Sequence, residues 1–383
     1  MSRAAEVTPD ITPDITPDIT LYALPHSYYS GKVRSYLRYK GIAYGETLST
    51  LNVFRRVIVP RTGVKYIPVI ETREGEFIQD STVIIDALES RYPQRSVYPE
   101  TPRQHLAALL LEILGDEWML MPGMHYRWSF WHEREHIDDV LEHFGLLLSP
   151  HAPRWLRRFF GRRACRPFAG ALPMLGITSE TIPEIEARYE RLLDQLNAHF
   201  SAHRYLLGER ASIGDFGLIG PLYAHLGRDF YPLALMRQRA PQVYAWVQRM
   251  NTSTPPIGDY VANDAIPETL MPVLRDLFTD YLPILRDTVS RLDQWIDDHP
   301  GRRIPRVIGR HRFRLGDIEA ERAIFPYAQW MLQRPLDYRA GLPAVQRAAV
   351  DDLLHALGDR SALDIHPRHR LGREHNRLVV TDA

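Results

Sequence analysis

The chain has 383 residues, with 45% hydrophobic and 25% charged side chains, which is typical of a globular protein of two or three domains. Because 47 basic side chains balance 47 acidic ones, we expect neither nucleic acid nor a membrane as a partner. The single cysteine, Cys165, excludes an intramolecular disulfide framework. No apolar run reaches membrane-spanning length and no signal peptide opens the chain, so we expect a cytoplasmic protein.

The first 18 residues contain a short repeat. The motif Thr-Pro-Asp-Ile occurs three times between Thr8 and Ile19. Proline at every fourth position blocks both helix formation and strand pairing. We therefore predict a disordered leader over residues 1–18.

An α/β pattern follows the leader. A strand is expected at 19–24, then a turn at 25–30 and a helix over 31–40 that ends at Gly41. Further along we expect a strand at 42–48, an irregular stretch to residue 66, a hairpin of 68–71 with 76–78, and a helix over 83–91. This order of βαβ and then ββα predicts a small α/β domain over residues 19–93.

Helical periodicity dominates the rest of the chain. Helix-like segments lie at 103–120, 183–204, 213–228, 240–250, 267–299 and 317–334. Residues 121–182 have the character of an insertion or a long helical hairpin. We expect a helical domain over 101–250, a helical extension over 251–361 and a flexible, polar and basic tail over 362–383. The predicted fold class is thus α/β plus all-α.

Asp80 and Ser81 stand where the second strand of the predicted hairpin gives way to a helix. Free backbone N–H groups and the positive end of the helix dipole favour a carboxylate ligand there. Asp80 adds a negative charge that suits an ammonium group, so the pair fits an amino-acid zwitterion. The alternative is an ordinary Asp/Ser helix cap.

Together these elements resemble the glutathione transferase superfamily. Leu24–Arg34 resembles the family's first strand-to-helix turn, where a Ser, Cys or Tyr faces the glutathione sulfur. Ile67-Pro68 resembles the cis-proline of thioredoxin-like folds, whose preceding residue offers its backbone to the ligand's cysteinyl part. Asp80-Ser81 resembles the acidic-Ser pair that binds the γ-glutamyl group.

A second resemblance lies in the helical part of the chain. Tyr205–Phe216 resembles the segment that opens the core helix of the family's helical domain, with Ser212 and Asp215 as a capping box. The resemblance covers about residues 19–250 and implies a thioredoxin-like N-terminal domain followed by a transferase-type helical domain. Extra C-terminal helices would follow these two domains.

The resemblance implies a role for the residues of the first turn. Ser27 occupies the position that faces the thiol, and Ser30 the position of the second cysteine in a redox CxxC, so dithiol chemistry is disfavoured. A Ser27 hydroxyl that donates to the glutathione thiolate would lower the thiol pKa, and the thiolate would be the nucleophile. Tyr28, Tyr29 and Ser30 remain alternatives, since their hydroxyls can donate as well.

Basic residues near the turn and the proline have two interpretations. Lys65 or Arg61 would bind the glycyl carboxylate of glutathione, or would be ordinary surface charges. For Lys32 and Arg34 we expect the exposed side of the first helix.

Aromatic residues and methionines crowd residues 118–131, where the family walls its hydrophobic substrate pocket. The alternative is plain helix packing. The candidates for substrate contact are Met121, His125, Tyr126, Arg127 and Trp128.

His132-Glu133-Arg134-Glu135-His136 matches the zinc-protease pattern HExxH. The two inner residues are charged, however, and Asp139 stands where a metzincin needs glycine. We therefore expect a polar helix face with local ion pairs, and no metal.

The predicted protein is a cytosolic glutathione transferase, with glutathione as co-substrate and a role in detoxification. Its thiolate would attack a small hydrophobic electrophile, in conjugation, ether cleavage, dehalogenation or isomerisation. By analogy with the family we expect a homodimer. The alternative is a non-catalytic scaffold or metaxin-like interaction protein of the same fold, which the long extension favours.

Overall fold

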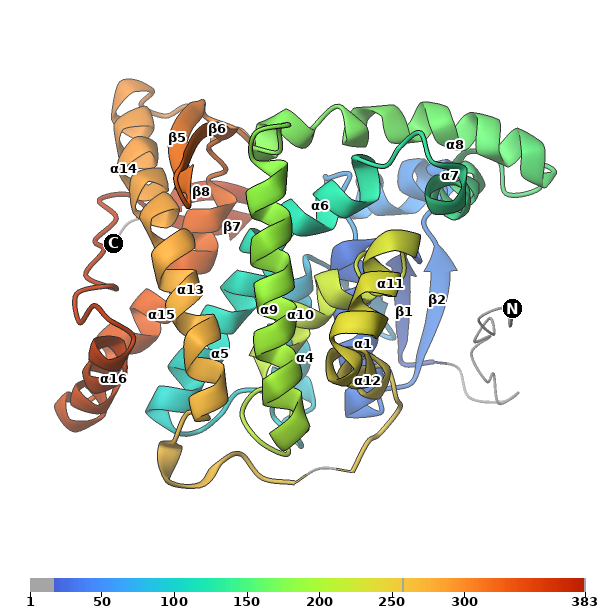
Figure 1. Cartoon of the computed structure of the whole chain (residues 1–383). Coiled ribbons are helices and arrows are strands. Elements are labelled where there is room, and N and C mark those ends of the chain that lie inside the picture. The colour runs from blue at the N-terminus through green and yellow to red at the C-terminus, as the bar shows by residue number, and fades with distance from the viewer. Residues whose placement is uncertain (1–16, 257, 382–383) are drawn as a thin grey trace.

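A computed structural model describes residues 17–256 and 258–381 (Figure 1). Most of the predicted leader therefore lies outside the described residues. In the N-terminal domain the strands form a sheet in the order β2-β1-β3-β4, in which β1 is parallel to β2 and antiparallel to β3. These strands are β1 (Ile19–Ala23), β2 (Tyr44–Leu48), β3 (Val69–Thr72) and β4 (Phe77–Gln79).

Two helices of this domain, α1 (Tyr28–Lys40) and α4 (Ser81–Arg91), pack against each other. Helix α1 begins three residues before the predicted start, because Ser27 caps it by accepting a hydrogen bond from the Ser30 amide. The stretch before residue 66, predicted to be irregular, is helical over α2 (Leu51–Val53), a π-helical turn η1 (Phe54–Ile58) and α3 (Val59–Thr62).

The helical domain is built around α10 (Ile213–Ala224), which packs on α1, on α5 (Pro102–Ile113) and on the π-helical segment η2 (Leu114–Trp118). Glycine allows this close approach, since a Cβ on Gly115 would overlap the backbone of Gly217. The domain also contains α6 (Leu120–Trp128), α9 (Ile182–Ala202), α11 (Phe230–Arg239) and α12 (Pro241–Met250).

The predicted insertion is a helical hairpin of α7 (Arg134–Leu148) and α8 (Arg154–Ala169), followed by the 3-10 turn η3 (Leu172–Leu175) (Figure 1). Acidic side chains of α7 pair with several arginines of α8, including Glu142 with Arg154 and Asp138 with Arg158. The hairpin therefore lies at the edge of the helical domain.

The extension packs on the side of the helical domain that is opposite β1 and β2 (Figure 1). Its elements are η4 (Ala262–Asp264), η5 (Glu268–Leu270), α13 (Met271–Asp280), α14 (Leu282–Asp298), β5 (Arg310–Leu315), β6 (Ile318–Ala323), α15 (Tyr327–Gly341), α16 (Ala344–Ala356), β7 (Arg370–Glu374) and β8 (Arg377–Thr381).

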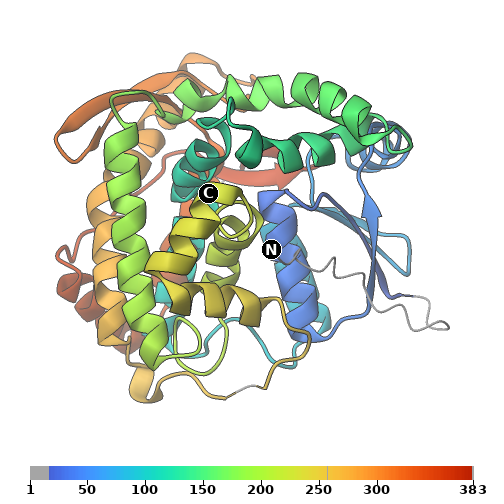
Figure 2. The ribbon, with the colours of Figure 1, turned by 45° about the vertical axis from the view of Figure 1, so that its right-hand side comes forward.

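Two parts of the extension differ from the prediction. Residues 318–323, predicted to be helical, form strand β6 opposite β5. The segment for which we predicted a flexible tail contains the antiparallel hairpin β7–β8, whose turn residues His375 and Asn376 both have positive φ, as a two-residue hairpin turn requires. Leu371 and Leu378 pack near Trp330, and the red hairpin reaches toward the blue N-terminal domain (Figure 2).

Candidate functional site

Residues from three parts of the N-terminal domain meet at one end of its sheet. Tyr22 of β1 pairs with Val69 of β3, and Val69 pairs with Gln79 of β4. Because β3 runs against both neighbours, the turn after β1, the segment before β3 and the residue after β4 lie at the same end. The structure thus brings Ser27, Ile67-Pro68 and Asp80-Ser81 to one edge.

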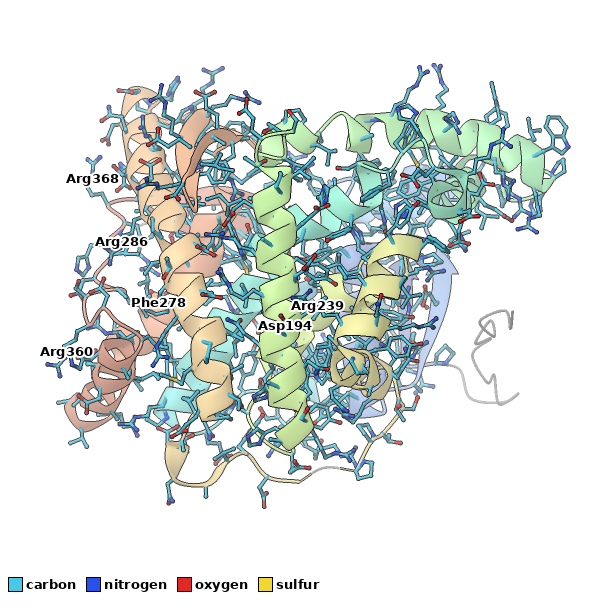
Figure 3. The ribbon with its side chains drawn as sticks, viewed as in Figure 1. Asp194, Arg239, Phe278, Arg286, Arg360 and Arg368 are labelled. Carbon is cyan, nitrogen blue, oxygen red and sulfur yellow. The ribbon has the colours of Figure 1, made fainter. Side chains whose placement is uncertain are left out.

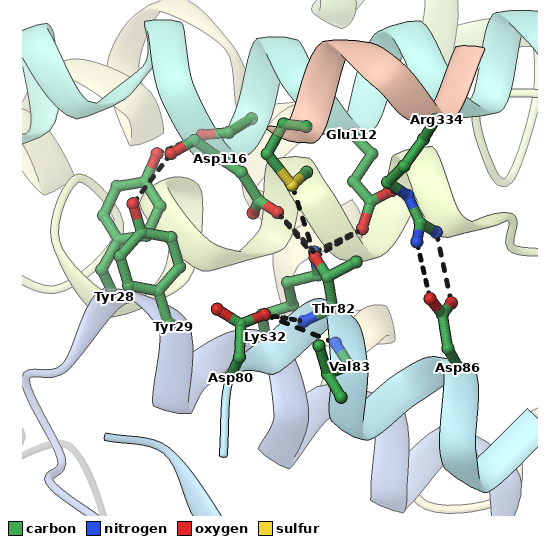
Figure 4. Close-up of polar contacts among 12 residues, drawn as sticks. Tyr28, Tyr29, Lys32, Asp80, Thr82, Val83, Asp86, Glu112, Asp116 and Arg334 are labelled. Carbon is green, nitrogen blue, oxygen red and sulfur yellow. Dashed lines mark hydrogen bonds and ion pairs between the residues drawn. The ribbon is translucent and has the colours of Figure 1, made fainter. Parts of the chain in front are cut away.

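Asp80 at the start of α4 has an unusual backbone. Its φ of 92° lies in a region that non-glycine residues rarely adopt, and such strain is concentrated at functional sites. Its Oδ1 atom accepts hydrogen bonds from the amides of Thr82 (3.0 Å) and Val83 (3.3 Å), as Figure 4 shows. Its own amide donates to Pro68 O at 3.3 Å, and the Ile67-Pro68 peptide is cis as predicted. The capping role is therefore confirmed for one carboxylate oxygen.

The second oxygen, Oδ2, has partners from the extension. The Tyr327 hydroxyl donates to it at 2.8 Å, and Arg373 Nη1 lies 3.3 Å away. Arg373 also donates to Gln79 Oε1 at 2.8 Å. Nothing in the sequence indicated that these two residues would meet Asp80, because they lie far along the chain in segments with no motif.

The other predicted contacts of the ligand lie nearby along the chain. Ser81 is the first residue of α4 and is buried, and Ile67 is partly buried. Lys65 is exposed in the segment that leads to the cis peptide. Its role as a carboxylate partner stays a prediction, as do those of Ile67, Pro68 and Ser81.

The hydroxyl groups of the first turn differ in what they contact. Ser27 Oγ accepts from the Ser30 amide at 3.3 Å, which leaves its proton for another acceptor. The hydroxyl groups of Tyr28 and Tyr29 instead donate to the backbone carbonyls of Gly115 and Asp116 in η2 (Figure 4). Burial raises the pKa of both phenols well above the ordinary value. Ser30 is fully buried. Ser27 thus differs from Tyr28 and Tyr29, whose hydroxyl protons are already donated, and the identity of the hydroxyl that meets the thiol stays a prediction.

A buried charge cluster lies directly behind the start of α4 (Figure 4). Lys32 Nζ donates to Thr82 Oγ1 at 3.1 Å, to Glu112 Oε1 at 2.7 Å and to Asp116 Oδ2 at 2.5 Å. Burial lowers the pKa of Lys32, but the two carboxylates outweigh it and raise that pKa. The predicted exposure of Lys32 and Arg34 is wrong, because α1 lies between the sheet and α10 and buries both. Lys32 thus ties the N-terminal domain to α5 and η2.

Two acidic residues of η2 have raised pKa values. Burial raises the pKa of Asp116 to about 7, although Lys32 opposes the shift. Burial, together with the charge of Asp116, raises the pKa of Glu117 to about 8, against the effect of Arg322. Perturbed acids of this kind are frequent at functional sites, although structural networks produce them as well.

The five predicted substrate contacts lie on α6, and all are buried. His125 contacts Glu186 at 3.0 Å and Ser129 at 2.8 Å. Arg127 donates to Asp229 at 2.7 Å and also to the carbonyls of His26 and Ala224. These partners lie on different sides of α6.

The remaining members of this set pack on other elements. The Tyr126 ring lies tilted against Tyr189 of α9, while the Trp128 ring meets Phe144 edge to face and stacks near Phe168 of the α7–α8 hairpin. Met121 borders an apolar hollow of about 30 Å³ between η2, α6, α9 and α13, which is room for about one water molecule. Neither Ser27 nor Asp80 lines that hollow. Substrate contact by the five residues stays a prediction.

The HExxH histidines do not meet as ligands. His136 Nε2 lies 3.1 Å from the carbonyl of Arg127, and His132 is exposed. Among the residues that the structure describes, His26, Asp139 and His143 do come together. However, Arg228 Nε lies 3.1 Å from His26 Nε2, so a permanent cation stands against the ligand atom, and we assign no metal there.

Comparison with known proteins identifies two domain models in this chain. The model for the N-terminal domain of glutathione S-transferase matches residues 21–96, and the model for its C-terminal domain matches residues 179–249. Among proteins with curated functions, none matches the chain. Within residues 17–256 and 258–381, no helix is both long and apolar enough to cross a membrane.

Several solved structures resemble the chain over about two thirds of its length. A glutathione S-transferase from Rhodospirillum rubrum is 16% identical over 65% of this chain and 96% of its own, with a TM-score of 0.41. One from Methylobacterium radiotolerans, in complex with glutathione sulfonate, is 20% identical over 64% and 99%, with a TM-score of 0.37. A β-etherase from a Sphingobium species is 19% identical over 61% and 95%, with a TM-score of 0.42. We draw no conclusion about substrate from them.

Proposed function

The chain belongs to the glutathione S-transferase superfamily, and on that premise we propose that it binds glutathione and transfers the glutathionyl group, through its sulfur, to a hydrophobic electrophile. The observation that carries this proposal is the hydrogen bond of 3.3 Å between the Asp80 amide and Pro68 O, which joins the two predicted binding segments. A γ-glutamyl group needs N–H donors for its carboxylate and an acceptor for its ammonium. The start of α4 offers both.

Each residue of the edge then has one task. Asp80 binds the ammonium of the glutamyl group, while the amide and hydroxyl of Ser81 bind its carboxylate. The backbone of Ile67, before Pro68, pairs with the cysteinyl part, and Lys65 pairs with the glycyl carboxylate. Ser27 donates to the thiolate, and the N-terminus of α1 adds its dipole.

The proposed reaction needs no group beyond the thiolate. Its sulfur lone pair forms a bond to an electrophilic carbon. In a substitution the leaving group departs with the electrons of the broken bond, and in an addition the electrons of the π bond pass to the neighbouring atom, which takes up a proton. Conjugation, ether cleavage, dehalogenation and isomerisation can all begin in this way. Met121 and its neighbours on α6 remain the proposed contacts of the electrophile. A cytoplasmic homodimer acting in detoxification is the setting that we propose by family analogy.

Calorimetric titration with glutathione tests the proposal. Wild-type protein should bind, and the double variant Asp80→Ala/Ser81→Ala should not, while both give the same circular dichroism spectrum. Binding that survives in the double variant would place glutathione elsewhere. Absence of binding at millimolar glutathione, by the wild type and by an Arg373→Ala variant alike, would overturn the transferase proposal.

One observation favours a second candidate, a non-catalytic module of the same fold. The carboxylate of Asp80 already has Tyr327 and Arg373 as partners from its own chain. If Tyr327 and Arg373 always stay bound to Asp80, these contacts serve only to hold the extension against the N-terminal domain. Under this candidate, glutathione neither binds nor changes the thermal unfolding of any variant.

A further inference from the structure

The hairpin β7–β8 crosses the edge at which glutathione is proposed to bind. On one side Asn376 Nδ2 donates to Thr62 O at 2.9 Å, and Arg377 donates to Gly63 O at 2.8 Å. On the other side Arg373 reaches Gln79 and Asp80. The hairpin therefore spans from the end of α3 to the start of α4, on either side of the Ile67-Pro68 peptide.

Arg373 and Asp80 form an ion pair. Its Nη1 atom lies 3.3 Å from Asp80 Oδ2 and, although buried, makes no hydrogen bond within the described residues. The guanidinium carbon lies 5.4 Å from the centre of the Trp330 ring, which supports the cation on its other side. The positive charge of Arg373 thus stands beside the same carboxylate that is proposed to bind the ammonium group of glutathione.

Tyr327 is fixed more firmly than Arg373. It begins α15, whose Arg334 donates to both carboxylate oxygens of Asp86, at 2.6 and 3.2 Å, and lies 3.4 Å from Glu112. Burial raises the pKa of Tyr327 well above the ordinary value, so its hydroxyl remains a donor to Asp80. This contact can persist when a ligand binds.

The hairpin is built in a way that allows it to move. It is a two-stranded ladder, a form that is marginally stable without support, and its turn residue His375 is exposed. Its base is held on α15, where Gln333 bonds to the amide and the carbonyl of Leu371 at 2.9 and 2.8 Å, and by the apolar packing of Leu371 and Leu378. The polar contacts at the edge are separate from this base, so they can be lost while the base stays on α15.

We propose that the extension supplies two residues to the glutathione site: Tyr327, which holds the Asp80 carboxylate, and Arg373, which occupies the ammonium position until glutathione displaces it. This proposal rests on the proposed function. The ligand-free chain then keeps Asp80 neutralised, and the apparent affinity for glutathione is reduced by the fraction of molecules in which the position is free.

The test compares Arg373→Ala with Arg368→Ala by calorimetric titration with glutathione. Arg368 is a matched control, because it removes one positive charge from the same segment but pairs with Asp297 on the outer side of α14 (Figure 3). Removal of Arg373 should tighten binding by about tenfold, which corresponds to about 1.4 kcal/mol. The control should bind like the wild type.

Each other outcome has a distinct meaning. Weaker binding by Arg373→Ala would show that Arg373 holds a carboxylate of the ligand, and equal binding would show that it does not compete. Either result would overturn the proposal that the ammonium of glutathione displaces Arg373 from Asp80. The proposed function would still stand, provided that Asp80→Ala/Ser81→Ala abolishes binding. Absence of binding in every variant overturns the proposed function itself.

Hydrogen exchange on wild-type protein gives a second readout that needs no substitution. Saturating glutathione should speed amide exchange over residues 370–381, because the hairpin loses its contacts at the edge. Exchange that stays unchanged or slows there, while the amides at the start of α4 become protected, would overturn the displacement.

Discussion

Two aspartates at helix starts show how the same local chemistry can have different uses. Asp215, in the first turn of α10, accepts from the amides of Ser212 and Leu206 at 2.9 and 3.0 Å and from the Trp246 indole at 3.2 Å. All of these donors are fixed and buried. Asp80 caps α4 with one oxygen, whereas its other oxygen meets Tyr327 and Arg373 from a separate part of the chain.

The difference lies in whether the partners can be exchanged. A buried carboxylate surrounded by fixed donors stabilises the fold and has no capacity for a ligand. An aspartate with a positive φ, one carboxylate oxygen of which pairs with a cation from a two-stranded hairpin, is suited to a charged ligand. Asp215 is accordingly assigned to structure, whereas Asp80 is the residue for which we propose a binding role.

The largest expected effect separates the two aspartates by stability. Asp215→Ala leaves several buried donors without an acceptor and should lower the free energy of unfolding by about 3–5 kcal/mol. Asp80→Ala removes a helix cap and should lower it by about 1 kcal/mol. Urea unfolding of both variants measures these values. Equal losses would remove the distinction between the two sites.

The next effect concerns the anchor that holds Tyr327 near Asp80. Arg334→Ala leaves the buried Glu112 without one of its cations and should lower the free energy of unfolding by about 2–4 kcal/mol. Arg360 (Figure 3) pairs with Asp352 on the surface. Arg360→Ala should therefore change the free energy of unfolding by less than about 0.5 kcal/mol. Thermal unfolding compares the pair, and similar shifts would mean that the extension is loosely attached.

A third acidic residue, Glu117 of η2, sharpens the comparison because burial and the charge of Asp116 raise its pKa. The pKa of Glu117 is about 8 in the folded state and 4.5 as the ordinary value, so the folded chain binds more protons between these values. The free energy of unfolding should therefore fall as pH rises from 5 to 8, by roughly 2–4 kcal/mol from this group. Glu117→Gln should remove that part of the pH dependence. An unchanged slope would place the pKa of Glu117 near its ordinary value.

The last effect concerns Ser27 and the thiol of bound glutathione. Ser27→Ala removes the cap of α1 and should lower the free energy of unfolding by about 1 kcal/mol. The pKa of bound glutathione should rise by about one unit, since the thiolate loses a hydrogen bond. Thiolate absorbance against pH measures this shift. If Ser27→Ala leaves it unchanged and Tyr29→Phe raises it, Tyr29 would be the donor.

Features that depend on a few neighbouring residues could be predicted from the sequence, whereas contacts between distant segments could not. Ile67-Pro68, Asp80-Ser81 and the Ser212–Asp215 box each follow from a few neighbouring residues. The burial of Lys32 depends on carboxylates of α5 and η2, which helical periodicity cannot indicate.

The extension was harder to predict for a related reason. In β6, glutamates alternate with small and apolar residues, a composition that also suits a helix. Tyr327 and Arg373 reach Asp80 through the packing of α15 and the last hairpin, and no local motif marks either residue. The part of the candidate site that comes from the extension was therefore visible only in the structure.

The most direct test of the central claim is a crystal structure of the full chain with glutathione. We expect the ligand's ammonium within hydrogen-bond distance of Asp80 Oδ2, its thiol beside the Ser27 hydroxyl, and Arg373 displaced from the edge. Glutathione bound elsewhere, or bound while the Asp80–Arg373 pair remains intact, would contradict this account.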